Sequence, residues 1–366
     1  MQQLLANTQT RLEREGNCQP KSIAIGFQND SRLVIGDDQR SSLINALMDA
    51  LDSTAVIIAH PHDNADTLAV RSTHSKELIP KDSESLSSLH SIPIIRHDQG
   101  GTTKTIHDTC IQALTNRKAC IVEGIGLVAH ASLTLEQAAI YWSSLYHATS
   151  IHLLSSYLTN PKSLSYEQRL FCQSQCAPSL ESVVIHAHTG KDALVDVGKQ
   201  MVRLGLVDSF FGNISWRSEN ELTISQTAAR LDELNHNLCT INLSSPSAIG
   251  LLASSELPAH RLVTNLPHAR FLLHGHPRVP VALSLAVDPR EESVVGIPVA
   301  DGDGGVGGLA DALYHVFKNT QHRSCIIRGH GIFCISSESA YDALTTMYSA
   351  DALCKQHLKI RIEHMA

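Results

Sequence analysis

The chain lacks several features that would place it in a class at once. Its 366 residues carry a net charge of −7 and show no basic stripe, so nucleic acid is a poor candidate partner. No apolar stretch reaches membrane-spanning length, and the first residues lack the apolar core of a signal peptide. Nine scattered cysteines, an odd number, argue against a full disulfide framework. We therefore expect a cytoplasmic protein with no membrane partner.

The chain does contain an internal repeat. Residues 55–62 resemble 269–276 at an offset of 214, and residues 119–127 resemble 324–332 at an offset of 205. A third block, 91–93, resembles 296–298 at the same offset of 205. Three blocks in one order predict a tandem duplication. Helical and strand patterns are mixed in each half, which predicts an α/β layered fold.

The join between the halves lies where Asn160-Pro161 ends a predicted helix, because proline cannot continue one. We predict a first domain over 1–160, a linker over 161–185 and a second domain over 186–366. The length of the chain is sufficient for two domains of ordinary size.

The most informative pattern is a set of histidines in the second half. His274 and His276 close an apolar run that we predict to be a strand, and His330 lies in a Gly-His-Gly turn. Alternate residues of a strand share a face, so the first two imidazoles lie together. With a third imidazole from another element they make a Zn²⁺ site with an open position. Glu256 could be a fourth ligand or act as a base, and on a predicted helix it shares a face with His260.

The first half keeps only part of this pattern. His60 and His62 stand where the second half has its His-x-His, but Ile125 replaces the third histidine. The stretch 40–43 replaces 254–256, so the carboxylate is absent as well. Two histidines alone make a poor site for a divalent ion. We predict that the first half is a scaffold.

The order of motifs in the second half resembles the class II aldolase/adducin family. The motifs are Gly212-Asn213, the turn at 224–228, Ser254-Ser255-Glu256, His274-Gly275-His276 and Gly329-His330-Gly331. The family includes fuculose-phosphate and rhamnulose-phosphate aldolases, ribulose-phosphate 4-epimerase, methylthioribulose-phosphate dehydratase and several decarboxylases. The resemblance covers about 190–366, and about 20–150 through the repeat. It implies two class II aldolase-like domains in tandem, each a three-layer α/β/α sandwich.

The resemblance also implies roles for particular residues. His274, His276 and His330 would hold Zn²⁺ or another divalent ion such as Mn²⁺, Co²⁺ or Fe²⁺, and Glu256 would be the catalytic acid/base. The metal would stabilise an enediolate formed from a small hydroxy-carbonyl or sugar-phosphate substrate, as in a carbon–carbon lyase. Four positions match the family's phosphate-binding residues: Asn213, Thr227, Ser254 and Ser255. For these four, plain turn chemistry is the alternative reading.

The chain departs from the family at two places. Ala228 replaces the usual glycine, and its Cβ could block close approach of a phosphate. The chain ends at Ala366 without the tyrosine-bearing tail that family aldolases use as proton donor. Two alternatives therefore stay open: an epimerase, dehydratase or decarboxylase on the same metal, or a non-catalytic adducin-like assembly protein. Because family members are typically rings of four, we expect a homo-oligomer, a dimer that forms a pseudo-tetrameric ring.

Overall fold

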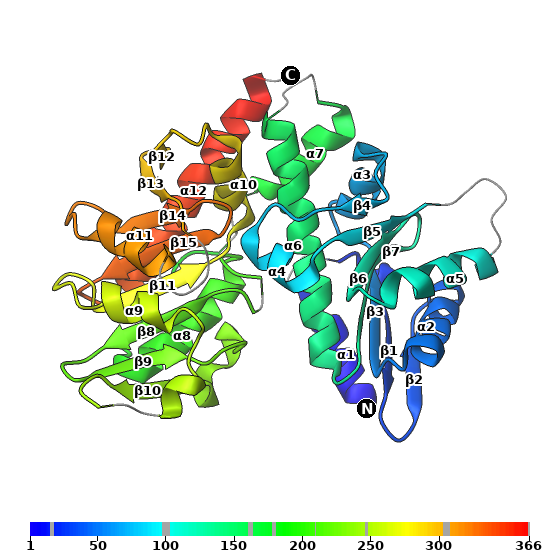
Figure 1. Ribbon diagram of the computed structural model, residues 1–366, viewed down its shortest axis with the longest axis horizontal. Coiled ribbons are helices and arrows are strands. Elements are labelled where there is room, and N and C mark those ends of the chain that lie inside the picture. The colour runs from blue at the N-terminus through cyan, green and yellow to red at the C-terminus, as the bar shows by residue number, and fades with distance from the viewer. Residues whose placement is uncertain are drawn as a thin grey trace. The chain divides into compact units, whose positions relative to one another are not determined.

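The protein is described from a computed structural model (Figure 1). It describes the following residues: 1–14, 18–96, 103–159, 164–177, 181–208, 210–245, 248–302 and 308–364. The chain divides into two compact units, Met1–Leu153 with Ser165–Phe171, and Leu154–Leu164 with Cys172–Ala366. Within these described residues, no helix is long and apolar enough to cross a membrane.

The first unit is built on a sheet with the strand order β2-β1-β3-β7-β6-β5-β4. The strands are β1 (Ala24–Gln28), β2 (Arg32–Ile35), β3 (Ala55–Ala59), β4 (Glu77–Leu78), β5 (Ile92–Ile95), β6 (Ala119–Val122) and β7 (Gly126–Ala131). The central strand β3 is buried along its whole length, as its uninterrupted apolar sequence requires of a strand covered on both faces. β5 and β6 pair in parallel, and the other neighbouring strands pair antiparallel.

Helices cover both faces of this sheet. They are α1 (Gln2–Arg14), η1 (Pro20–Ser22), α2 (Asp38–Leu51), α3 (Ala65–Ser72), α4 (Ser83–Leu89), α5 (Thr103–Leu114), α6 (Leu135–Thr159) and α7 (Tyr166–Gln175). On one face, Ile44 and Leu47 of α2 pack with Ile58 of β3 and with α5. On the other face, the buried Trp142 of α6 donates its indole N–H to the carbonyl oxygen of Leu127 at 3.2 Å. Helix α7 falls inside the segment that we predicted as a linker, and residues 161–163 and 178–180 of that segment lie outside the described residues.

The second unit has a sheet of the order β10-β9-β8-β11-β15-β14-β13-β12. Its strands are β8 (Asn213–Arg217), β9 (Glu221–Ser225), β10 (Leu238–Asn242), β11 (Phe271–Gly275), β12 (Ser293–Val294), β13 (Ile297–Ala300), β14 (Ser324–Ile327) and β15 (Gly331–Ser336). Its helices are α8 (Gly190–Arg203), η2 (Leu231–His236), η3 (Ala248–Leu251), α9 (Leu257–Val263), α10 (Arg278–Ala286), α11 (Gly308–Phe317) and α12 (Ala340–His364). Helices α9 and α11 pack on one face of the sheet through Val263, Leu313 and Phe317, while α8, α10 and α12 lie on the other.

The two sheets share one topology. Every strand of the first sheet has a counterpart at the same place in the second, with the same parallel or antiparallel pairing. Among the described strands only the edge strand β10 lacks a counterpart in the first unit. The predicted α/β class, with two helix–sheet–helix sandwiches in tandem, is confirmed.

The pairing register corrects the alignment of the first repeat block. Ala59 of β3 pairs with Leu127, and Gly275 of β11 pairs with Ile332. Leu127 and Ile332 are equivalent, since both follow the Gly-x-Gly turn at the offset of 205. Ala59 is therefore equivalent to Gly275, and the offset across this block is 216 rather than 214.

This shift changes which residues of the first unit match the histidines of the second. His60 matches His276, and Ile58 matches His274. The prediction that His60 and His62 replace the two histidines of the second half is therefore wrong, and His62 lies beyond the strand. A slip of two residues leaves every side chain on its original face of the sheet, so the alternating pattern of the sequence could not reveal it.

Candidate metal centre

The three histidines of the second unit converge at one end of its sheet. His274 is in β11, His276 follows that strand, and His330 lies in the turn between β14 and β15. The ring centroid of His274 lies 4.4 Å from that of His276 and 4.9 Å from that of His330. One nitrogen of each ring lies within 4.8 Å of the others, and all three residues are buried. The sheet therefore brings together three imidazoles that are 56 residues apart in sequence at most.

His274 has a defined orientation. Its Nδ1 lies 3.1 Å from the carbonyl oxygen of Ile332, and because a carbonyl only accepts, Nδ1 carries the proton. The other nitrogen, Nε2, is buried without a hydrogen bond and presents a lone pair to the cluster. Burial lowers the pKa of His274 to about 3, so the ring is neutral at neutral pH. A neutral imidazole with one nitrogen fixed by a carbonyl is the form in which histidine binds metals.

The turn that carries His330 depends on a glycine. A Cβ at Gly331 would lie 2.5 Å from Cε1 of His274 and 2.6 Å from the carbonyl oxygen of Gly275. Both distances are far inside van der Waals contact, so only glycine lets β15 approach β11 this closely. Gly331 thus sets the separation of His274 and His330.

Glu256, immediately before α9, faces this cluster. Its Oε1 lies 2.8 Å from Nε2 of His330 and 3.5 Å from Nε2 of His274. Burial acts to raise the pKa of the carboxyl, but the neighbouring His274, His330 and Asn213 outweigh it and lower the pKa to about 2. Glu256 is therefore a carboxylate at neutral pH, with only 9% of its side chain exposed.

A chain of hydrogen bonds leads from Glu256 into the core. The amide nitrogen of Asn213 donates to Oε2 of Glu256 at 2.8 Å, so its Oδ1 faces Nε2 of His260 and accepts from it. Nδ1 of His260 must then accept, and the hydroxyl of Ser215 donates to it at 2.6 Å. Burial lowers the pKa of the fully buried His260 to about 4, which keeps the ring neutral. This relay, defined as Ser215, His260, Asn213 and Glu256, fixes every proton and aims a donor at the carboxylate.

Sequence reasoning identified neither Ser215 nor the role of His260. The available signal was the spacing of four between Glu256 and His260, which places both on one side of α9. Ser215 lies two residues after Asn213 on β8, on the same face of that strand. Without the fold, a serine two residues after an asparagine does not indicate a hydrogen bond to His260.

The four predicted substrate-binding residues lie in and around this end of the sheet. Asn213 bonds Glu256, as described above. The hydroxyl of Thr227 donates to the carbonyl oxygen of Ala253 at 2.7 Å, and the hydroxyl of Ser254 accepts from the amide of Glu256 at 3.3 Å. Ser255 is exposed. The turn after β9 and the turn before α9 are thus joined, with the carboxylate next to them.

Ala228, the residue in the usual glycine position, keeps the backbone conformation that a glycine would have. Its φ is +56°, in the left-handed region that L-residues adopt at a cost. The turn has therefore kept the shape that the motif implies, and the alanine adds strain to it.

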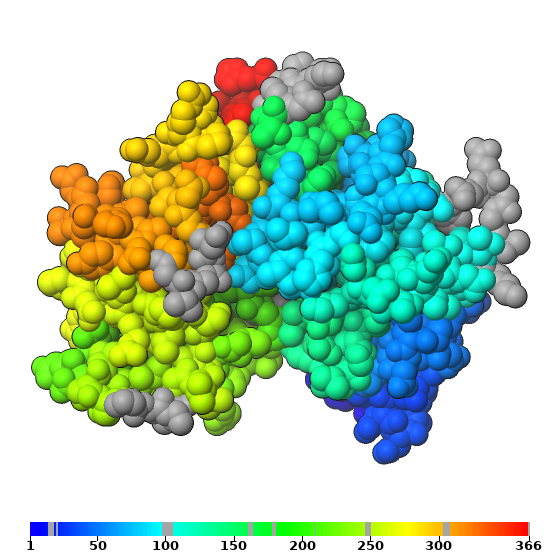
Figure 2. Space-filling view, viewed as in Figure 1, coloured from blue at the N-terminus to red at the C-terminus, as the bar shows by residue number. Residues whose placement is uncertain are grey.

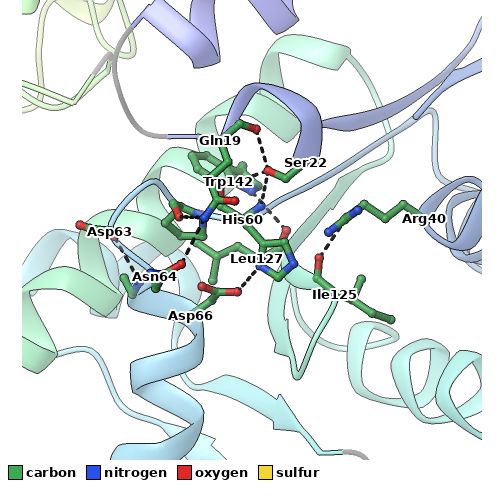
Figure 3. A network of polar contacts seen from close by, with 12 residues as sticks. Gln19, Ser22, Arg40, His60, Asp63, Asn64, Asp66, Ile125, Leu127 and Trp142 are labelled. Atoms are coloured by element: carbon green, nitrogen blue, oxygen red, sulfur yellow. Dashed lines mark hydrogen bonds and ion pairs between the residues drawn. The ribbon is translucent and has the colours of Figure 1, made fainter. Parts of the chain in front are cut away.

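The corresponding place in the first unit is rebuilt (Figure 3). Ile44 of α2 approaches Gly26 of β1, as His260 of α9 bonds Ser215 of β8, so Ile44 is equivalent to His260. Arg40, one helical turn earlier, therefore occupies the position of Glu256. Figure 3 shows its guanidinium directed at the carbonyl oxygen of Ile125, to which Nε donates at 3.1 Å.

Of the three histidines, only the counterpart of His276 remains in the first unit. Nδ1 of His60 lies 2.6 Å from Oδ2 of Asp66, as Figure 3 shows. Ile58 and Ile125 stand in the places of the other two imidazoles, and a cation stands in the place of the carboxylate. Within its described residues, the first unit by itself holds no group of three potential metal ligands close together.

Comparison with known families assigns the second unit. Residues 192–358 match the family described as Class II Aldolase and Adducin N-terminal domain. This segment is a class II aldolase/adducin domain. It contains Glu256, all three histidines of the cluster and the relay. A search of curated proteins found no match to the chain.

Solved structures of class II aldolases are also similar to about half of this chain. L-fuculose-1-phosphate aldolase from Thermus thermophilus is 28% identical, covering 47% of this chain and 93% of that one, with a TM-score of 0.38. YgbL from Klebsiella pneumoniae, a putative aldolase/epimerase/decarboxylase, is 22% identical and covers 45% of this chain and 86% of its own, with a TM-score of 0.40. The N-terminal class II aldolase domain of a Thermoplasma acidophilum protein is 12% identical, covering 50% and 99%, with a TM-score of 0.41.

Proposed function

We propose that the class II aldolase/adducin domain is a metal-dependent lyase that acts on a small hydroxy-carbonyl compound or sugar phosphate. His274, His276 and His330 would hold a divalent ion of the Zn²⁺ type. The observation that carries the proposal is the convergence of three buried imidazole nitrogens within 4.8 Å, beside a buried carboxylate.

The residues present fit such an ion. The buried Nε2 of His274 has no hydrogen bond, and its lone pair is the group that a cation would satisfy. Three neutral ligands would leave the charge of the ion intact for work on a substrate. When bound, the ion would polarise a substrate carbonyl and stabilise negative charge on its oxygen.

Glu256 is the proposed acid/base. Its carboxylate is shielded from water, and Asn213 holds one oxygen while the other faces the histidines. While His330 donates to Oε1, the low pKa makes the carboxylate a weak base. A metal ion on Nε2 of His330 would take the place of the proton that this nitrogen donates, so Oε1 would no longer accept a hydrogen bond from His330. Oε1 is then the atom that would take a proton from the substrate and return it.

Asn213, Thr227, Ser254 and Ser255 are proposed to bind the phosphate or carboxylate of the substrate. Hydroxyls and amides at two adjoining turns offer short donors to such a group. Ser254, in the turn before α9, accepts from the backbone amide of Glu256, and Asn213, at the start of β8, donates to its carboxylate. Binding of the anion would therefore fix the position of the base.

An epimerase, dehydratase or decarboxylase reaction could use the same residues. Each of these reactions needs a polarised carbonyl and a group that moves a proton at a neighbouring carbon. YgbL, one of the proteins with a similar structure, is named a putative aldolase/epimerase/decarboxylase. An adducin-like assembly role is the alternative for a chain without turnover.

The test is turnover of a panel of sugar phosphates and hydroxy-keto acids by metal-loaded protein. Glu256→Gln should abolish turnover while its metal content stays that of the wild type. Glu233→Gln, an exposed carboxylate in the same unit, is the matched control and should keep full activity. Full metal loading without turnover on the whole panel would contradict the enzyme and favour assembly.

We also propose that two chains form the ring of four domains that the family resemblance implies. The repeated topology gives each chain two domains of the kind from which such rings are built. Sedimentation at micromolar concentration should give a dimer, and a monomer would count against the ring.

A further inference from the structure

The first unit contains a cavity away from its rebuilt metal position. It has a volume of about 750 Å³ and lies between the segment 74–77, β5 with Arg96, and α5 with the residues after it. We call it the basic pocket, because its charged lining residues are three cations, Lys76, Arg96 and Arg117, against one carboxylate, Glu77. In Figure 2 the segment 74–77 is light blue and α5 is teal, and both lie at the surface of the first unit.

The two arginines of the basic pocket are held by neutral groups. Arg96 donates to three main-chain carbonyl oxygens, those of Ser75 at 2.8 Å and of two residues at the end of α3. Arg117 donates through Nε to the hydroxyl of Ser91 at 3.0 Å. Among the described residues, no carboxylate forms an ion pair with either guanidinium or with Lys76. The positions of the two guanidinium groups are therefore fixed, and the charges of Arg96, Arg117 and Lys76 stay available to an anion.

The positive charge of the pocket is found in the first unit and not at the equivalent place in the second. The second unit has a cavity of about 720 Å³ at the equivalent place, where Asp301 stands in the position of Arg96. There, two cations face three carboxylates, and Arg328 pairs with Asp301 at 2.8 Å. The duplicated topology therefore tolerates either sign, and a positive pocket has arisen in a chain whose net charge is −7.

The other residues that line the pocket suit an organic molecule better than an inorganic ion. Ile95 and Ile106 give the pocket an apolar side, against which a carbon skeleton can pack. Thr105, Thr109 and Gln112 of α5 add hydroxyl and amide groups that hydrogen-bond to hydroxyls or phosphate oxygens.

We propose that the basic pocket of the first unit binds a small phosphorylated organic anion. A phosphate ester carries up to two negative charges and several acceptor oxygens, which matches two fixed guanidinium groups and an ammonium better than a single carboxylate does. The site uses no residue of the metal centre, so it gives the unit without metal ligands a binding role of its own. Occupation of this pocket and occupation of the metal centre are separate events.

The test is calorimetric titration of the full-length protein with glucose 6-phosphate and with inorganic phosphate, at constant ionic strength held with sodium chloride. Arg117→Gln and Lys76→Gln are the test variants, because Arg96 also holds main-chain carbonyls and its loss could unfold the unit. Each variant should weaken binding about tenfold or more, the usual effect of losing one charge-assisted hydrogen bond. Arg290→Gln, in the equivalent cavity of the second unit, is the control and should bind as tightly as the wild type. His330→Ala, in the metal centre, distinguishes the two sites: the binding that Arg117→Gln and Lys76→Gln weaken should remain in it.

Two results would overturn the assignment. One is the absence of saturable binding of both probes to the wild type at millimolar concentration. The other is binding that survives both Arg117→Gln and Lys76→Gln but is lost in His330→Ala, which would place the anion at the metal centre. If the protein turned over no substrate, the proposed lyase would be contradicted but the proposed anion binding would not, because the pocket variants do not alter the metal centre.

Discussion

The relay beneath Glu256 allows a double-mutant cycle. Asn213→Ala removes the donor to Oε2 of Glu256 and the acceptor of His260. His260→Ala removes its bonds to Asn213 and Ser215 and leaves a cavity at a fully buried position. Both variants destroy the same hydrogen bond between Asn213 and His260, so their effects on the free energy of unfolding should not add.

The structure gives the size of the effect. Loss of a charge-assisted hydrogen bond costs about 2 kcal/mol, and a buried donor left without a partner costs about 1–3 kcal/mol. We therefore expect each single variant to lower the free energy of unfolding of the second unit by about 3 kcal/mol. The double variant should lose about 1–2 kcal/mol less than the sum, because the shared bond is counted twice and its two ends leave together.

Urea unfolding followed by circular dichroism measures each variant, with metal removed by chelator so that metal affinity does not enter. Thr345→Ala combined with Asn213→Ala is the control, since the Thr345 hydroxyl bonds Tyr341 in α12 and shares no partner with the relay. That pair should be additive within about 0.5 kcal/mol. If Asn213→Ala and His260→Ala are also additive, the two side chains do not act through each other and the relay is refuted.

Three further predictions concern strain, pH and packing. Ala228→Gly should raise the stability of the second unit by about 1 kcal/mol, or its melting temperature by about 2–4 °C, because it relieves a φ of +56°; a lower melting temperature would contradict this. Burial lowers the pKa of His260 from 6.5 to about 4, so the folded state binds this proton less readily than the unfolded chain. Its contribution to stability, about 3 kcal/mol at most, is complete above pH 6.5 and is lost as the pH falls toward 4. His260→Gln should flatten the pH dependence in that window, and an unchanged slope would rule the group out. Gly331→Ala should lower metal content sharply, since its Cβ would lie 2.5 Å from His274, whereas Gly250→Ala, with its nearest neighbour at 3.9 Å, should not; full metal in Gly331→Ala would contradict the packing argument.

Sequence alone was sufficient for the fold class and for naming the three histidines and Glu256 that the structure brings together. The Gly-x-Gly turns fix one strand pair in each half, and the apolar runs fix the central strands, so the repeat and the α/β class followed from local patterns. The three-layer sandwich was what the family resemblance implied. The same patterns could not fix the register of β3 and β11, because a shift of two residues preserves the face of each side chain. His60 and His62 were assigned to the wrong counterparts for that reason.

Contacts between distant residues were beyond the reach of the sequence. Arg40 looked like part of a simple loss of the Ser-Ser-Glu motif, yet it stands where the second unit has Glu256 and bonds the residue that replaces a histidine. The direction of the Asn213 amide depends on the buried ring of His260, which lies 47 residues away in sequence. Charge on the lining of the basic pocket comes from three separate segments, and no one of them is basic enough to draw notice.

The central claim is a single metal site in the second unit and none in the first. Elemental analysis of protein purified without chelator tests it directly, on the wild type and on the equivalent pair His276→Ala and His60→Ala. We predict about one divalent ion per chain in the wild type and in His60→Ala, and almost none in His276→Ala. Two ions per chain, or loss of the ion in His60→Ala alone, would contradict the assignment, as would a wild type that takes up no metal even with Zn²⁺ added.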